Sequence, residues 1–331
     1  MSSSSEPERP QLDVAELEQV EEIVEQRPPE ERALGEQAAA ARKGRGWITA
    51  AWTLPGGIWL GFYLIAPLVF IVLVSFWTYK VGAKFGFTTE WTLHNYGQVF
   101  HDSTYWHNMI KSLETSVIAV AACLVLGFPI AYFLALKVQT LRNQIALFII
   151  ALAPFWTSFL VRSVAWTYPL MGRTGALNQF LIKIGIVDKD HPVAAFGASQ
   201  LSVTLALIQL YILFMITPLF FTLSQVDRTA LEAAHDLGGN WWRTFREVIL
   251  PQTLPGIVIG SIFIFVLTMG EYGTVLVVGE NAVQSVGTTV NLYIQGAVQY
   301  PQGAAAAVLL VLALIAGVFV ITRFSNLREE L

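Results

Sequence analysis

The chain has 331 residues, of which 54% are apolar and 13% charged, and its mean hydropathy is +0.55. A soluble globular protein carries about 25% charged residues, so this composition excludes an ordinary cytosolic enzyme, a disordered chain and a disulfide-rich scaffold. The net charge of −4 hides a division, because residues 1–41 hold 11 of the 24 acidic side chains and three of the 20 basic ones. This division predicts an acidic tail joined to a hydrophobic, weakly basic body.

The tail, residues 1–46, is rich in Glu, Gln, Ser and Pro and cannot bury a core, so we expect it to be mostly disordered and cytoplasmic. Within it, four apolar residues fall at helical spacing inside Gln11–Gln26, which predicts a short amphipathic helix. That helix is either a solvated, partly formed segment or a docking element for a cytoplasmic partner.

Six apolar segments of about 20 residues follow, the length that a helix needs to cross a bilayer. Lipid offers no partner for backbone polar groups, so each segment must be helical. Residues 47–331 are therefore predicted to form an all-α membrane domain. The six predicted spans are Trp52–Phe76, Ser112–Leu136, Ile145–Tyr168, Ser199–Leu223, Thr253–Val278 and Gly303–Thr322.

Basic residues set the orientation of these spans. If the N-terminus is inside, the inner segments hold ten Lys and Arg residues in about 54 positions, whereas the outer loops hold six in about 90. Positive charge concentrates on the cytoplasmic side of membrane proteins. We therefore expect a multi-pass protein of the bacterial inner membrane with both termini in the cytoplasm.

One outer loop contains a short segment with an apolar face, Ala176–Ile184, which Gly185 follows. The spacing predicts a helix that lies flat at the outer membrane surface. It either packs against the bundle or forms a landing surface for a soluble protein outside.

The inner loop 224–252 carries the most specific pattern. Asp227 is placed to cap a short helix, and Thr229 with Glu232 offers an alternative capping box. The helix should end at Gly238-Gly239 because glycine readily takes the left-handed conformation. A second helix is predicted after the glycines, and Pro251 is expected to end the segment before the next span. The pattern predicts a compact helix–turn–helix with an apolar face that docks.

This loop resembles the EAA loop of ABC importer permeases, although Val248 stands where that family usually has Ile. The matching elements are Glu232-Ala233-Ala234, Gly238 and Leu250-Pro251, which keep the family's spacing. The resemblance implies the type I ABC importer permease fold, with six transmembrane helices and a cytoplasmic coupling helix. By resemblance, Glu232 contacts the ATPase, Gly238 makes the turn, and the ATPase-coupling residues are Glu232, Ala233, Ala234, Asp236, Gly238, Leu250 and Pro251. The alternative is an ordinary amphipathic connector.

Four further stretches resemble the spermidine/putrescine branch of these permeases: Trp91–Tyr96, Val161–Trp166, Gly175–Asn178 and Pro301–Ala305. The resemblance implies a permease that imports polyamines by alternating access. Branches for iron, sulfate, phosphonates or opines share much of the pattern, so another small solute is the alternative substrate.

The chain lacks the GxxxxGK[ST] phosphate loop, so we expect a non-catalytic transport subunit without cofactors of its own. The family implies a separate ATPase dimer that binds ATP and Mg, and a soluble or lipid-anchored substrate-binding protein. Six spans make half a pathway, so a second permease subunit is expected, as a heterodimer rather than a homodimer. Membrane lipid surrounds the spans, and no nucleic acid partner is expected. The docking loop argues against an ion-coupled secondary transporter, and no clustered catalytic residues indicate a membrane enzyme.

Charges within spans are rare and cost about 2.5–3.5 kcal/mol each at mid-membrane. Arg162 and Glu271 fall at similar predicted depth, so they form either a structural pair or part of the substrate path. Carboxylates and aromatic rings bind ammonium groups well. The candidate pathway residues are therefore Glu271, Tyr272, Glu114, Trp156, Trp166 and Arg162. The outer-loop histidines lack ligand spacing, so no metal site is expected.

Overall fold

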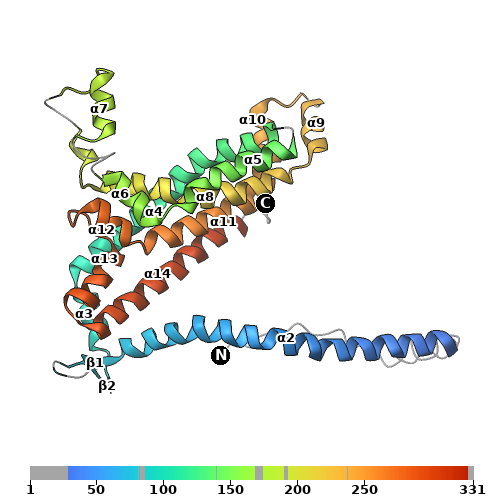
Figure 1. Ribbon diagram of the computed structural model, residues 1–331, viewed down its shortest axis with the longest axis horizontal. Helices are drawn as coiled ribbons and strands as arrows, with labels where there is room; N and C mark the ends of the chain where they lie inside the picture. Colours follow the sequence, from blue (N-terminus) through green and yellow to red (C-terminus); the bar gives the residue numbers. More distant parts are fainter. Residues whose placement is uncertain are drawn as a thin grey trace. The chain divides into compact units, whose positions relative to one another are not determined.

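The computed structural model describes residues 29–80, 82, 86–138, 140–167, 174–189, 193–236 and 238–326 (Figure 1). The chain divides into two compact units, Met1–Val69 and Phe70–Leu331. The predicted amphipathic helix Gln11–Gln26 lies outside the described residues.

Helix α2 (Pro29–Ser75) is the described part of the first unit and runs on into the second. Proline suits the first position of a helix, and the Ala, Glu, Gln and Arg that follow it are strong helix formers. Residues 29–46 are therefore helical, although we expected a mostly disordered tail up to residue 46. The membrane-crossing part of α2, Trp52–Ser75, matches the first predicted span to within one residue.

A small antiparallel sheet of β1 (Trp77–Tyr79) and β2 (Phe87–Trp91) follows, which the sequence did not predict. The rings of Trp77 and Phe87 stack across it with centroids 5.2 Å apart. The buried side chain of Asn95, in α3 (His94–His101), donates to the backbone oxygens of Ser75 and Trp77 at 2.9 and 2.8 Å. These bonds fix α3 against the end of α2.

The core of the second unit lies between α4 (Ser103–Tyr132), α8 (Gln200–Ser224) and α11 (Leu250–Met269), and α14 (Tyr300–Asn326) packs against α11 (Figure 1). Small residues let α8 and α11 approach closely. A Cβ on Gly260 would lie 2.7 Å from Sδ of Met215, and one on Gly256 would lie 2.8 Å from the backbone oxygen of Pro218. Any larger residue at these two positions would push the helices apart.

Five helices in the described part of the chain are long and apolar enough to cross a membrane, or six if one bent pair counts as a span. Their order agrees with the six predicted spans. The second begins at Ser103 rather than Ser112, because Oδ1 of Asp102 caps it by accepting from the backbone nitrogens of Thr104 and Tyr105 at 2.8 and 3.4 Å. It continues through a π-helical turn, η1 (Phe133–Lys137).

The third predicted span, Ile145–Tyr168, is broken. Helix α5 (Leu141–Leu152) passes through a 3₁₀ turn, η2 (Ala153–Trp156), and α6 (Phe159–Ala165) then leaves at an angle of 84°. Pro154 cannot continue the helical hydrogen bonds, and Thr157 and Ser158 have extended backbone angles. The third predicted span is therefore two helices rather than one.

The fifth predicted span, Thr253–Val278, also ends early. Helix α11 stops at Met269 with Gly270 as its cap, and α12 (Gly273–Gly279) starts after a turn. Glu271 and Tyr272 thus lie between two helices rather than inside one. The outer part continues through α13 (Val286–Asn291) and a π-helical turn, η6 (Leu292–Gly296). Helix α7 (Ala176–Lys183) confirms the predicted outer-loop helix, and a 3₁₀ turn, η4 (Ala194–Phe196), follows it.

Candidate functional site

The inner loop folds as the predicted helix–turn–helix. Helix α9 (Arg228–Asp236) follows Asp227, whose Oδ1 accepts from the backbone nitrogen and the hydroxyl of Thr229 at 2.9 and 2.8 Å. These hydrogen bonds hold the pKa of the Asp227 carboxyl below its usual value. The charged carboxylate thereby caps the positive end of α9.

The two glycines make the turn after α9. Gly238 has φ of +76°, in the left-handed region that favours glycine. The nitrogen of Gly239 donates to the oxygen of Ala234 at 2.9 Å, and a Cβ on Gly239 would lie only 2.6 Å from that oxygen. Asn240 then caps α10 (Trp241–Thr244) by accepting from the nitrogen of Arg243 at 2.8 Å. The turn is therefore fixed from both sides.

Apolar contacts tie this loop to the bundle. Val226 is buried, and Leu231 and Phe245 pack against the core of α4 and α8. The ring of Phe245 meets that of Phe128 edge to face at 5.4 Å. The loop is thus mechanically joined to the membrane helices, so a force on α9 reaches α4 and α8.

The predicted ATPase-coupling residues lie mainly on the surface. Glu232, Ala233 and Asp236 are exposed on α9, and Ala234 and Leu250 are half-buried. Pro251 was expected to end the segment, and this prediction was wrong, because the helix runs from Trp241 to Met269 without a break. A π-helical turn, η5 (Phe245–Ile249), directly precedes α11, and Pro251 is the second residue of α11.

Glu271 is held by side chains and backbone from three segments. Its Oε2 accepts from the hydroxyl of Tyr211 on α8 at 2.6 Å, and its Oε1 accepts from the nitrogen of Thr274 on α12 at 2.8 Å. Its backbone oxygen accepts from the hydroxyl of Ser285 at 2.8 Å. The half-buried carboxylate thus has two neutral donors.

Arg162, on α6, does not pair with Glu271. The two ion pairs among the described residues are Lys111–Glu114 and Arg243–Glu247. The guanidinium carbon of Arg162 instead lies 5.0 Å from the centroid of the Phe155 ring, and its buried Nε has no hydrogen-bond partner.

The remaining aromatic candidates are scattered. Tyr272 is half exposed and lines a cavity of about 290 Å³ together with Asn281, Gln284 and Asn291. The indole nitrogen of Trp166 donates to Oε1 of Gln209 at 3.1 Å. Trp156 is 82% exposed, which places it on the surface of the chain rather than beside Glu271.

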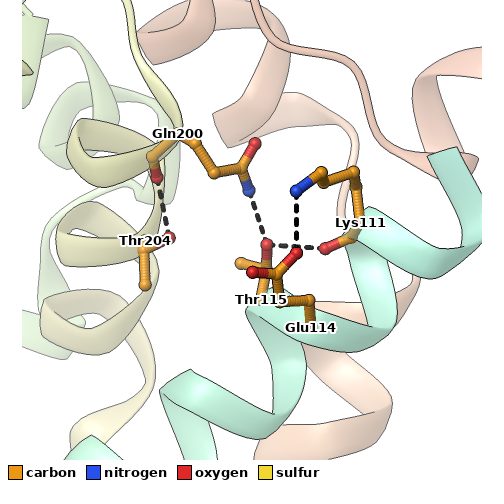
Figure 2. A network of polar contacts seen from close by, with 5 residues as sticks. All are labelled: Lys111, Glu114, Thr115, Gln200 and Thr204. Carbon is orange, nitrogen blue, oxygen red and sulfur yellow. Dashed lines mark hydrogen bonds and ion pairs between the residues drawn. The ribbon is translucent and has the colours of Figure 1, made fainter. Parts of the chain in front are cut away.

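Glu114 belongs to a polar network between α4 and α8, drawn in Figure 2. Its Oε2 lies 2.9 Å from Nζ of Lys111, and both side chains are about half exposed. The hydroxyl of Thr115 donates to the backbone oxygen of Lys111 at 2.8 Å and accepts from Nε2 of Gln200 (Figure 2). The structure therefore gives Glu114 a cationic partner within the chain.

Sequence reasoning missed Tyr211, which is buried on α8 and is the side chain that bonds Glu271. The available signal was a phenol within the apolar segment Gln200–Ser224, because a buried hydroxyl needs a hydrogen-bond partner. In the described part of the chain, no group of three or more His, Cys, Asp or Glu is placed to hold a metal ion.

Comparisons with known proteins identify a family, sequence relatives and a solved structure with a similar fold. A family model described as "Binding-protein-dependent transport system inner membrane component" matches residues 127–329. The spermidine/putrescine transport system permease protein PotB of Haemophilus influenzae is 32% identical over 272 residues, 82% of this chain and 92% of the relative. The protein of the same name in Escherichia coli is 31% identical over 82% of this chain and 96% of the relative. The crystal structure of a bacterial ABC transporter that imports alginate superposes with a TM-score of 0.57 at 17% identity, covering 87% of this chain and 98% of that chain.

Proposed function

The chain belongs to the family of binding-protein-dependent transport system inner membrane components, and we propose that it forms half of the membrane pathway of an ATP-driven importer of polyamines. The fold and the family confirm the ABC importer permease that the sequence predicts. The relatives that cover most of the chain are transport permease subunits, so this chain is a transport subunit rather than the ATPase.

The observation that carries the coupling role is the capped, exposed α9 on a loop that packs into the bundle. Its exposed acidic side chains, Glu232 and Asp236, suit a groove of a separate ATPase dimer that binds ATP and Mg. ATP binding draws the ATPase subunits together, α9 transmits this motion through Phe245 and Leu231 to α4 and α8, and the pathway opens outward. Hydrolysis returns it to the inward-open state, because each nucleotide state stabilises one conformation over the other.

A polyamine fits the half-buried carboxylate of Glu271. Glu271 supplies a negative charge for an ammonium group, and Tyr272, which is half exposed next to it, offers an aromatic face. The two relatives at 32% and 31% identity carry spermidine and putrescine by name, which supports the same substrate class here.

Because this chain forms only half of the membrane pathway, it needs further partners. The chain pairs with a second permease subunit, different in sequence, and a soluble or lipid-anchored binding protein delivers the substrate from outside. The excess of basic residues in the inner segments supports an inner-membrane topology with both termini in the cytoplasm.

The test is ATP-dependent uptake into proteoliposomes that contain this chain with its ATPase, second permease and binding protein. We expect radiolabelled spermidine and putrescine to accumulate only when the ATPase has ATP, and iron, sulfate, phosphonates and opines not to compete. ATP-dependent uptake of one of these solutes, with no spermidine uptake, would overturn the polyamine assignment. Uptake driven by an ion gradient without ATP would instead overturn the importer class.

A further inference from the structure

Arg162 carries an unused hydrogen-bond donor at a buried position. Its Nε has no partner, and its guanidinium rests on the Phe155 ring at 5.0 Å. Removing a charged donor from water without giving it an acceptor is unfavourable. The contact of an arginine with an aromatic ring is favourable, but the ring does not supply the hydrogen-bond acceptor that Nε lacks.

The face of α6 that carries Arg162 is turned towards the Glu271 turn. Phe159 and Ser163 share this face because they are four residues apart, and Arg162, three residues after Phe159, lies at its edge. The hydroxyl of Ser163 lies 3.3 Å from that of Thr274, which follows Glu271 by three residues. The ring of Phe159 lies 6.4 Å from that of Tyr211, the residue that bonds Glu271.

Glu271 has room for a cation. Each carboxylate oxygen has two lone pairs, and each accepts a single hydrogen bond here, from Tyr211 or from Thr274. Both donors are neutral, and Glu271 forms neither of the two ion pairs among the described residues. A cation that reaches this carboxylate gains Coulomb attraction, and a second cation at the same place is repelled by the first.

We propose that Arg162 and an ammonium group of the substrate bind Glu271 alternately, so that Arg162 displaces the substrate and completes its release. This rests on the proposed polyamine function. With substrate bound at Glu271, Arg162 stays on the Phe155 ring. On the return to the inward-open state, α6 turns about the extended residues Thr157 and Ser158, and Arg162 takes the carboxylate. The substrate then leaves towards the cytoplasm.

The alternation is tested by Arg162→Gln in the purified complex with its ATPase and second permease. We expect radiolabelled spermidine to bind at least fivefold more tightly and to be released at least fivefold more slowly, with turnover reduced to match. Arg162→Lys should restore release because the cation is kept. Arg142→Gln removes an exposed arginine at the start of α5 and is the matched control, with no change expected.

A purely structural Arg162 predicts another result. Arg162→Gln would then lower the yield or the turnover without tightening spermidine binding, and Arg162→Lys would not restore release. Either result overturns the alternation. Yield and size-exclusion profile, measured on the same samples, separate misfolding from a kinetic effect, and Arg162→Lys carries the test if the glutamine variant does not fold.

A double mutant ties the effect to Glu271. Glu271→Gln should lose most spermidine binding, and adding Arg162→Gln should then change neither binding nor release further. An independent effect of Arg162→Gln in that background contradicts the proposal. Normal spermidine binding by Glu271→Gln alone overturns the substrate role of Glu271. Lost binding in Glu271→Gln with normal release in Arg162→Gln overturns the alternation only.

Discussion

Single polar side chains fasten the outer end of the bundle. Asp102 caps α4 and accepts a hydrogen bond from the hydroxyl of Tyr293 in η6. Tyr105, one turn further along α4, donates to the backbone oxygen of Ala306 on α14 at 2.9 Å. The N-cap of α4 and a residue in its first turn thus join η6 and α14, which are about 190 to 200 residues away in sequence.

The charge of Asp102 makes this fastening dependent on pH. Burial raises the pKa of the carboxyl, but the hydrogen bonds from Tyr293, Thr104 and Tyr105 outweigh it and hold the pKa below its usual 3.8. A lowered folded-state pKa adds stability above pH 3.8, and this stability is lost as the pH falls through the folded-state value. Burial and the bond to Asp102 raise the pKa of Tyr293, so its hydroxyl stays a donor.

Asp102→Asn should therefore keep the helix cap but remove the pH-dependent contribution to folding stability. We expect its thermal unfolding temperature in detergent to lie below that of the parent at pH 6 and to converge with it near pH 3. Asp102→Ala also loses the cap, which costs about 1 kcal/mol, and should be lower at both pH values. A constant difference between parent and Asp102→Asn across this range would contradict the role of the charge.

At the level of elements, hydropathy predicted where helices exist but not where they break. The six apolar segments were found because each is long enough to cross a bilayer. The break after Trp156 and the stop at Met269 lie within apolar sequence, so hydropathy does not register them. Pro154 and Gly270 were visible, but whether such a residue bends or ends a helix depends on its packing.

The coupling loop and the surroundings of Glu271 also differ in how far the sequence predicts them. The coupling loop was predictable because capping residues, glycines and the family spacing are local in sequence, and α9 with its Asp227 cap and the Gly238 turn confirm that geometry. The surroundings of Glu271 were not predictable, because Tyr211 lies 60 residues away and reaches it only through the packing of α8 against α11 and α12.

The turn after α9 gives a prediction for the coupling element. Gly239→Ala places a Cβ 2.6 Å from the backbone oxygen of Ala234, so the end of α9 must shift. We expect it to abolish ATP-driven uptake while the protein still inserts into the membrane.

Gly238 has open space around a Cβ, so Gly238→Ala costs only its left-handed angle, roughly 1–2 kcal/mol. Gly238→Asn, which tolerates that angle, should be closest to the parent. The measurement is substrate-stimulated ATPase activity; full stimulation in Gly239→Ala would refute the rigid turn.

At the scale of the whole molecule, the topology depends on whether the bent pair α5–α6 crosses the membrane. Contacts with α8 answer this. Phe148 on α5 stacks on Phe220 at 4.9 Å, Phe159 on α6 lies 6.4 Å from Tyr211, and Trp166 bonds Gln209. As the pair advances from residue 148 to 166, its contact on α8 retreats from 220 to 209, which is roughly 16 Å at 1.5 Å per residue. The pair therefore runs antiparallel to α8 instead of turning back, and we count it as one crossing.

With the N-terminus inside, one crossing by this pair puts α7 outside and the coupling loop inside; a re-entrant pair would reverse both and would move the C-terminus outside. Reporter fusions test this directly. We expect alkaline phosphatase to be active when fused after Lys183 in α7 and inactive when fused after Gly238, with a fluorescent protein at the C-terminus giving the opposite, cytoplasmic signal. The ten inner basic residues should also hold this orientation, so replacing Arg243 and Arg246 by Gln, which leaves eight, should weaken it only partly. Phosphatase activity after Gly238 with no activity after Lys183 would show that the pair does not cross, and it would move the coupling loop away from any cytoplasmic ATPase.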